Sequence, residues 1–141
     1  MSADKRIGPR DLGIKLHDKS GRDHFKWLLA CQLFGAPISQ EVAANTYRLL
    51  DKKGFTTPDK LARADWQELV DLLDEGGYRR YDESTARELI SIGKVTKEKY
   101  GGSFKEFLDE ARSRAETRRK VQQFKGVGPT AADIFMREAK L

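Results

Sequence analysis

Apolar residues recur at intervals of three and four along most of the chain, and Gly, Pro and short polar residues separate these periodic segments. No segment alternates convincingly between apolar and polar positions, as a half-buried strand would. The pattern predicts an all-α fold of short helices and short loops, packed as a single compact domain over residues 23–141. Residues 1–22 hold several glycines and only a short apolar set, and we expect a partly flexible N-terminal arm there.

Residues that can cap a helix N-terminus precede most of the periodic segments, and glycine follows the end of several. A short turn is expected to open at Thr57-Pro58, because Pro suits the first helical position. The longer helices are predicted between Asp23 and Gly35, Ser39 and Gly54, Asp65 and Gly76, Asp82 and Gly101, Ser103 and Ala111, Ser113 and Phe124, and from Pro129 onward.

Several side chains are interpreted from their local pattern. Trp27 and Trp66 lie on apolar helix faces, so we expect both in the core. His17 and His24 have no Cys or carboxylate at the spacing of a metal site, so we expect surface histidines. Cys31 lies on an apolar helix and is typical of a small buried residue rather than a nucleophile.

The composition excludes several classes of protein. The chain has 141 residues, one of which is cysteine, and its N-terminus has no apolar stretch. There is no run of about 18 apolar residues, so we expect neither a transmembrane helix nor a secretory signal. One cysteine cannot form a disulfide framework or ligate an iron–sulfur cluster, and we predict neither. These features favour a cytoplasmic location.

Charge is concentrated in two blocks of opposite sign. Residues 64–77 carry five acidic side chains and no basic one, whereas residues 112–125 carry six basic side chains and one acidic. The formal net charge of +5 averages these blocks and is a weak indication by itself. A polyanion would avoid the first block and prefer the second. The alternative is that both blocks are solvated helix faces, as charge runs usually are.

The segment after the basic block predicts a tight hairpin between two helices. Gly126 and Gly128 permit positive φ and a close approach of another backbone. Pro129 suits the first position of the following helix. We expect Val127 to plug into the core and hold the hairpin rigid. The alternative is a plain helix–turn–helix corner with glycine in the turn.

Such a hairpin would bind anions. The N–H groups of Gly128, Thr130 and Ala131 would point outward, without partners, at the positive end of a helix. A phosphate of a nucleic-acid backbone suits this position. Lys125 and the arginines of the preceding helix, Arg118 and Arg119 among them, would add attraction that any sequence satisfies.

A second candidate contact lies in the loop at residues 78–81. Here Arg79 and Arg80 alternate with Tyr78 and Tyr81. Interleaved basic and aromatic residues suit phosphate contact and base stacking. The alternative is a loop anchored by Tyr with solvated arginines.

The run Phe124-Lys125-Gly126-Val127-Gly128-Pro129-Thr130-Ala131-Ala132 resembles the helix-hairpin-helix motif of the endonuclease III-like DNA glycosylase superfamily. The order of the preceding motifs is similar over residues 23–139. They are residues 28–32, the Thr-Pro turn at 57–62, residues 68–78, and the helix from Ala86 to Gly102. The resemblance implies the family's helical barrel, ending in a hairpin at residues 124–130.

The resemblance also implies residue roles. Gly126, Val127, Gly128 and Thr130 match the hairpin backbone that binds DNA phosphate. Carbonyls of such a hairpin can hold Na⁺ or K⁺, which here would involve Phe124 and Val127. Gln32 matches the glutamine that enters the duplex near a displaced base, and the alternative is a surface amide.

Other residues depart from the family's pattern. The resemblance therefore implies a reduced member of the family, one that lacks the usual catalytic Lys and Asp. Thr130 stands where bifunctional members carry a catalytic lysine, and threonine cannot form a Schiff base. The family's catalytic aspartate lies well beyond the hairpin, whereas this sequence extends to Leu141. Neither Asp133 nor Glu138 fits its place. The catalytic residues therefore stay unknown.

Three hypotheses follow. The first is a non-catalytic protein that binds double-stranded DNA, either intact or damaged, through the hairpin and is located at the nucleoid if the source is bacterial or archaeal. The second is a minimal DNA glycosylase or abasic-site lyase, which would need Lys120, Lys125 or a partner chain for catalysis. The third is a protein-interaction module that kept the fold. A homodimer or a partner chain could complete a cleft.

Overall fold

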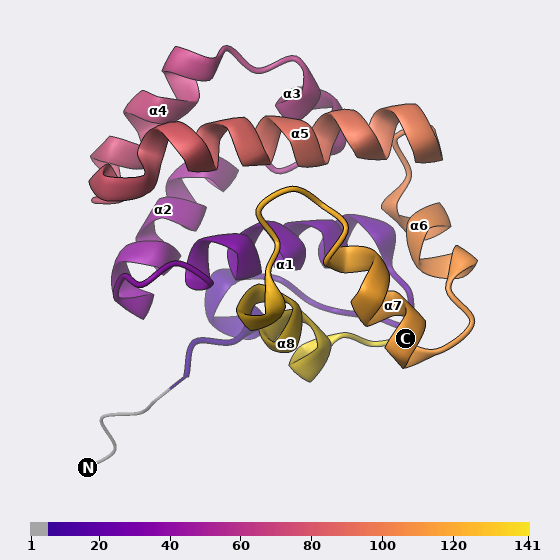
Figure 1. Cartoon of the computed structure of the whole chain (residues 1–141). Helices are drawn as coiled ribbons and strands as arrows, with labels where there is room; N and C mark the ends of the chain where they lie inside the picture. The colour runs from indigo at the N-terminus through magenta and orange to yellow at the C-terminus, as the bar shows by residue number, and fades with distance from the viewer. Residues whose placement is uncertain (1–5) are drawn as a thin grey trace.

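The structure is a computed structural model that describes residues 6–141. The described residues form eight α-helices joined by loops and contain no strand (Figure 1). The prediction of an all-α domain is therefore confirmed. The elements are η1 (Pro9–Leu12), α1 (Gly21–Phe34), α2 (Gln40–Lys52), α3 (Pro58–Ala62), α4 (Trp66–Glu75), η2 (Arg79–Tyr81), α5 (Asp82–Tyr100), α6 (Phe104–Glu110), α7 (Arg114–Val121) and α8 (Pro129–Glu138).

Helix α1 is the centre of the core. Between His24 and Leu33 every residue except Lys26 is buried. Helices α2, α6 and α8 all pack against it, and Figure 1 shows it running through the middle of the molecule. An amphipathic helix buries one stripe, so burial on all sides means that α1 can exist only with its neighbours in place.

Helices α3, α4 and α5 form a second group around the longest helix, α5. Gly93 permits the close approach of α5 to α3, because a Cβ at this position would lie 2.7 Å from both the backbone nitrogen of Ala62 and the Cβ of Leu61. Thr85, Leu89 and Ile92 lie on the buried side of the same helix. This side of α5 faces the core, and its other side is available to solvent.

The predicted N-terminal caps are confirmed at five helices. In each case the side-chain oxygen accepts a hydrogen bond from the backbone three residues on, which satisfies one of the unpaired N–H groups of the first turn. These caps are Ser39, Thr57, Asp65, Ser103 and Ser113. Two boundaries differ: α1 begins at Gly21, two residues before Asp23, and α7 ends at Val121 rather than Phe124.

Most of the predicted arm packs on the domain. Residues 1–5 lie outside the described part of the chain. Beyond them, Leu12 and Ile14 are buried in the core. The backbone N–H of Lys19 donates to the carbonyl of Lys140 at 2.7 Å, so the segment before α1 also pairs with the segment after α8.

The expectation that His24 is a surface residue is wrong. Its side chain is fully buried, and it joins two distant segments. Nδ1 lies 2.6 Å from the carbonyl oxygen of Ser20 and donates to it, and Nε2 accepts from the backbone N–H of Lys140 at 2.9 Å. These two bonds require the neutral ring with its proton on Nδ1.

None of the helices over residues 6–141 combines the length and the apolarity that a bilayer crossing requires.

Protonation of His24 should destabilise the fold. Burial lowers the pKa of His24 below its ordinary value of 6.5, which the unfolded chain retains. Between the two values the unfolded state binds more protons, so the free energy of unfolding should fall as the pH decreases from about 6.5 and level off below the native pKa. His24→Gln keeps an acceptor for Lys140 and should remove this component, at a cost of about 1–2 kcal/mol near neutral pH.

Urea unfolding of both proteins, followed by circular dichroism from about pH 8 to pH 5, measures the effect above the range in which ordinary carboxylates titrate. Parallel stability curves for the two proteins would contradict the role assigned to His24.

Candidate nucleic-acid interface

The predicted hairpin is present between α7 and α8. Figure 1 shows its loop crossing in front of α1, with α5 on one side and α8 on the other. Phe124 and Val127 are buried in the core, and the backbone N–H of Val127 donates to the carbonyl of Phe124 at 3.1 Å. The expectation that Val127 plugs into the core is confirmed. The turn is therefore anchored in the core by these two side chains, while Lys125 and Gly126 are exposed at its tip.

Gly126 is needed for the packing of the hairpin. Its φ is +89°, and a Cβ added there would lie 2.4 Å from the carboxyl group of Glu88 and 2.7 Å from Nε2 of Gln32. The hairpin therefore sits directly on two polar side chains, one from α1 and one from α5.

Gly128 has no such role inside the chain. Its φ of −92° is open to any residue, and a Cβ there would meet no heavy atom within 4 Å. It is the N-cap of α8, and Pro129 is the first helical residue, as predicted. No hydrogen bond within the described residues uses the N–H groups of Gly128, Thr130 or Ala131. The positive end of α8 is thus bare, and the space in front of Gly128 is open.

A pocket of about 290 Å³ lies beside this helix end. The start of α8, with Thr130 and Ala131, lines it, and so do Tyr78, Tyr81 and the first turns of α5. Its remaining walls come from the C-terminal end of α1, the loop after it, and the hairpin itself. Gly35, Gln32, Glu88 and Gly126 are among the residues that line it.

Gln32 and Glu88 form a hydrogen-bonded pair in the pocket wall. Nε2 of Gln32 donates to Oε1 of Glu88 at 2.6 Å, and Oε1 of Gln32 is buried without a partner among the described residues. Only 6% of Gln32 is exposed, so the alternative of a surface amide is wrong. In this arrangement the amide is held beneath the hairpin. The role in which Gln32 enters a duplex requires it to leave Glu88.

Glu88 was missed by the sequence reasoning. Burial raises the pKa of this carboxyl group, while Lys125, the hydrogen bond from Gln32 and Arg87 oppose the effect. This carboxyl group contacts the hairpin at Gly126 and lines the same pocket as the start of α8. Its position between Thr85 and Ile92, at helical spacing on an otherwise buried row, is the signal that could have identified it.

Fewer basic side chains of the 112–125 block are free to bind a polyanion than its composition indicates. Arg114 donates to the carbonyl of Met136 at 2.6 Å, and Arg118 donates through Nε to Asp133 at 3.1 Å. Nζ of Lys120 donates to the carbonyl of Phe107 at 2.8 Å and to Glu110 at 3.0 Å. Half of the cations in this block therefore join α7 to α6 and α8 and are partly neutralised.

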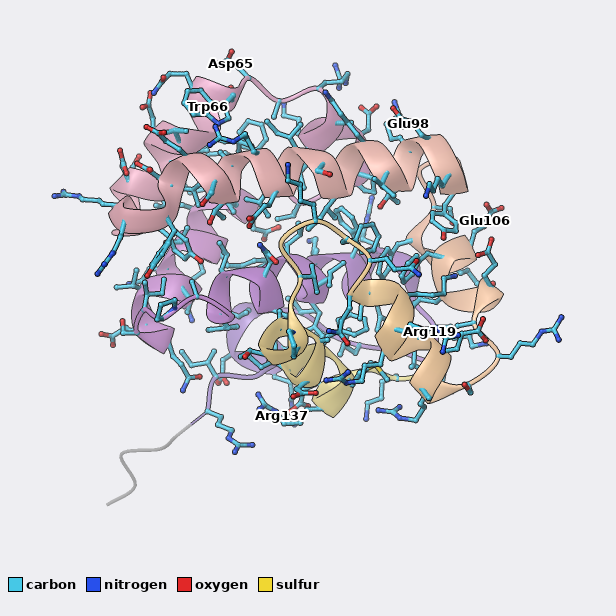
Figure 2. The ribbon with its side chains drawn as sticks, viewed as in Figure 1. Asp65, Trp66, Glu98, Glu106, Arg119 and Arg137 are labelled. Carbon is cyan, nitrogen blue, oxygen red and sulfur yellow. The ribbon has the colours of Figure 1, made fainter. Side chains whose placement is uncertain are left out.

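Four predicted contact residues keep exposed cationic groups. Over residues 6–141, neither Arg119 nor Lys125 takes part in an ion pair, and the same is true of Arg79 and Arg80. Figure 2 shows Arg119 on α7, whereas Lys125 is at the hairpin tip. Arg79 and Arg80 lie in η2, between the two tyrosines of the pocket wall, with Arg80 5.9 Å from the ring centroid of Tyr81. The structure thus gathers Gln32, Gly126, Gly128, Thr130 and Ala131 around the pocket. Lys125 lies at the adjoining hairpin tip outside the pocket lining, and Arg118 and Arg119 lie farther away on α7.

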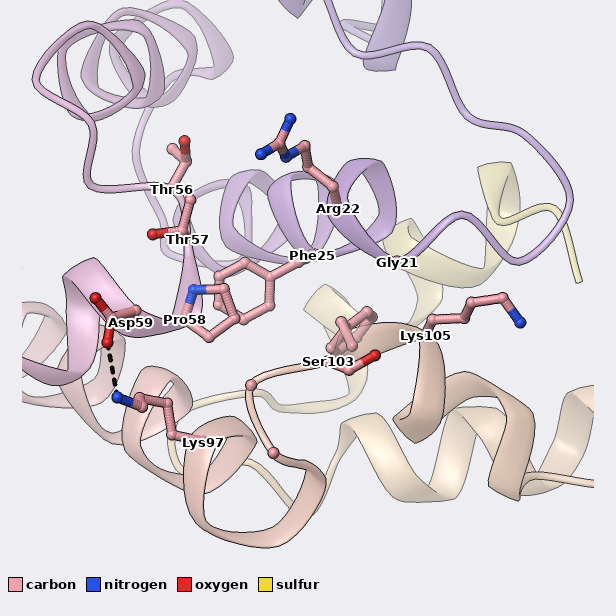
Figure 3. Close-up of a pocket in the computed structure, with 13 residues that line it drawn as sticks. Gly21, Arg22, Phe25, Thr56, Thr57, Pro58, Asp59, Lys97, Ser103 and Lys105 are labelled. Carbon is pink, nitrogen blue, oxygen red and sulfur yellow. Dashed lines mark hydrogen bonds and ion pairs between the residues drawn. The ribbon is translucent and has the colours of Figure 1, made fainter.

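A separate pocket of about 550 Å³ lies where the start of α1 meets the end of α5 (Figure 3). Phe25, Pro58 and Phe104 contribute apolar surface, and the ammonium of Lys97 is 2.6 Å from the carboxylate of Asp59. Lys105 is paired with Asp109 in the same way, whereas Arg22 forms no ion pair within residues 6–141. None of the predicted nucleic-acid contacts lies here, although the pocket includes the predicted turn at Thr57-Pro58.

Metal binding has limited support in the geometry. Within residues 6–141 there is no cluster of three or more His, Cys, Asp or Glu side chains that could hold a metal ion. A monovalent cation would instead use backbone carbonyls, and the carbonyl of Phe124 already accepts one hydrogen bond from Val127.

Neither a scan against protein-family models nor a search of curated proteins finds a match to this chain.

The two hairpin glycines should respond differently to substitution. Gly126→Ala forces a side chain into left-handed backbone and against Glu88, and should destabilise the protein by about 2 kcal/mol. Gly128→Ala fills open space and should cost no more than about 1 kcal/mol, the loss of a good N-cap residue. Urea unfolding of the two variants provides the comparison. Equal losses would contradict the assignment of Gly126 to packing and of Gly128 to open space.

Proposed function

We propose that this protein binds double-stranded DNA by gripping a backbone phosphate at the hairpin of residues 124–130. The observation that carries the proposal is the bare, open N-terminus of α8 at Gly128. Unpaired N–H groups there meet the positive end of the helix dipole, and no side chain obstructs an approaching phosphate. Neither its φ nor its surroundings require glycine at position 128. A glycine there is consistent with the close approach of another molecule to the backbone.

The free cations support the same proposal. Lys125 lies at the tip of the hairpin, and Arg79 and Arg80 flank the pocket wall across from α8. These groups would attract phosphate without reading base sequence. Glu88 opposes them, because a carboxylate near the phosphate position repels a polyanion. We therefore infer a modest, salt-dependent affinity for duplex DNA and, with it, a place at the nucleoid if the source is bacterial or archaeal.

The proposal relates the protein to the endonuclease III-like superfamily without ordinary glycosylase catalysis. Thr130 supplies no amine at the position of the family's lysine. Lys120, one of the two substitutes considered, is 11% exposed in its side chain and is held by Phe107 and Glu110. Of the two lysines considered as catalytic amines, Lys125 is therefore the one that remains.

We also keep the proposal that a second copy or a partner chain completes the cleft.

Gly128→Val and Lys125→Ala should both weaken the binding of a blunt duplex. The valine obstructs the phosphate and should reduce affinity at every salt concentration. The loss of Lys125 removes about one phosphate contact and should lower the slope of log K against log salt by about 1. Fluorescence anisotropy of a labelled duplex at graded salt measures both effects.

Lys53→Ala is the matched control, because Lys53 is exposed in the turn after α2 and lines none of the pockets beside the hairpin. A duplex affinity that does not change with salt concentration would contradict the proposed contact with phosphate. Absence of binding under all conditions would favour the protein-interaction module.

A second function is favoured by one observation, the Glu88 carboxyl group beside the hairpin. Burial raises its pKa above the ordinary value of a glutamate, which is the direction of change required of a carboxyl group that transfers a proton. In an abasic-site lyase, the Lys125 amine would attack the sugar aldehyde, lose water and form a Schiff base, while Glu88 exchanges the proton.

Glu88→Gln separates the two functions. In a binding protein, removal of the negative charge should leave duplex affinity equal or raise it severalfold. In a lyase, the same change should reduce the yield of a borohydride-trapped adduct on an abasic duplex by about 10²-fold or more. Lys125→Ala should abolish the adduct. If wild-type protein gives no adduct and releases no base from damaged duplexes, the second function is excluded.

A further inference from the structure

A second groove opens on the other side of the hairpin tip, between α4 and α5. We call it the α4–α5 groove. Trp66, Ile90 and Val95 provide its apolar floor, and Arg87, Lys94 and Lys125 provide its basic rim. Its volume is about 690 Å³. All three floor residues pack against the core but are partly exposed, so the expectation that Trp66 belongs to the core holds for only part of its ring. Figure 2 shows Trp66 at the start of α4, above α5.

Trp66 is held in a fixed orientation. Its Nε1 donates to the carbonyl of Glu83 at 3.2 Å, and the guanidinium of Arg87 lies 5.8 Å from its ring centroid. Trp27, by contrast, is completely buried and donates to the carbonyl of Phe135. An indole that is oriented by a hydrogen bond and a cation, yet left partly open, offers a rigid surface for another flat ring.

The charge around the groove selects the class of ligand. Glu98 is the one acidic residue of its lining, against three basic ones, and none of the three basic residues forms an ion pair within residues 6–141. The acidic side chains of the 64–77 block do not line it. A basic rim over an apolar floor suits a polyanion with flat apolar faces. Duplex DNA hides those faces in its stack, whereas an unpaired strand exposes them.

The groove is continuous with the proposed phosphate site. Lys125 belongs to its rim, and the next residue, Gly126, lines the pocket beside α8. We propose that the α4–α5 groove binds an unpaired DNA strand, with a base stacked on Trp66, next to duplex held by the hairpin. The physiological target would then be a junction between duplex and single strand. This inference rests on the proposed function.

Trp66 is also the reporter for the test. We compare a blunt duplex with the same duplex carrying a short unpaired thymidine tail, by anisotropy and by tryptophan fluorescence. Because Trp27 is buried, quenching would come from Trp66. The tail should raise affinity about tenfold, the usual scale for one stacked base, and should quench the emission. The blunt duplex should leave the emission unchanged.

Two variants locate the effect. Trp66→Ala should abolish the gain from the tail while leaving affinity for the blunt duplex within twofold. Lys94→Glu changes an exposed rim residue that leaves the core intact, and it should also remove the gain. Lys53→Glu is the matched charge reversal and should preserve the gain in full. Circular dichroism of each variant checks that the helices are retained.

The outcomes separate this inference from the proposed function. If the blunt duplex binds but the tail adds nothing, the groove assignment is overturned and the hairpin proposal stands. If single-stranded DNA quenches Trp66 while the blunt duplex fails to bind, the groove assignment stands and the hairpin proposal fails. Emission that changes with protein concentration, without DNA, would show a second copy in the groove and would overturn the assignment.

Discussion

Burial of α1 on all sides is the constraint on which the rest of the structure depends. Its apolar residues cannot be satisfied by one neighbouring helix, so α2, α6 and α8 must surround it. Polar atoms at its edges fix where these neighbours lie. Trp27 donates to the carbonyl of Phe135 in α8, and Tyr78 donates to the carbonyl of Leu33 at 3.1 Å. His24 then ties the end of the chain to the start of α1.

The packing of helices around α1 also determines where the hairpin lies. Gly126 rests on Gln32 of α1 and Glu88 of α5, so the tip lies where the two groups of helices meet. The contact needs an uncharged, side-chain-free residue at a positive φ, which glycine provides. Two open surfaces result, one at the bare end of α8 and one at Trp66, with Lys125 between them. The proposed phosphate site and the proposed stacking site would therefore lie side by side on a single small domain.

The basic side chains fall into two groups: those that bind groups within the fold and those that stay exposed. Arg114, Arg118 and Lys120 neutralise helix ends and carboxylates within the fold. The exposed remainder, at the hairpin tip, in η2 and along α5, is what a nucleic acid would meet. Glu88 sits among these cations and limits their attraction. In the proposed lyase it would be the acid–base group, so the same residue weighs against tight binding and is the one feature that favours the second proposed function.

Local pattern was sufficient for the helices, for caps such as Ser39 and Ser113, and for the Gly-Pro start of α8, because these depend on neighbours within four residues. It also located the hairpin, since glycine and proline act through their own backbone. It failed at His24 and Glu88, and at Trp66 it did not predict that part of the ring stays exposed. Their burial and partners come from segments far away in sequence, and a helical pattern cannot say which face another helix covers. The sequence determined the elements and the glycine turn between α7 and α8, and the tertiary structure alone decided which side chains surround that turn.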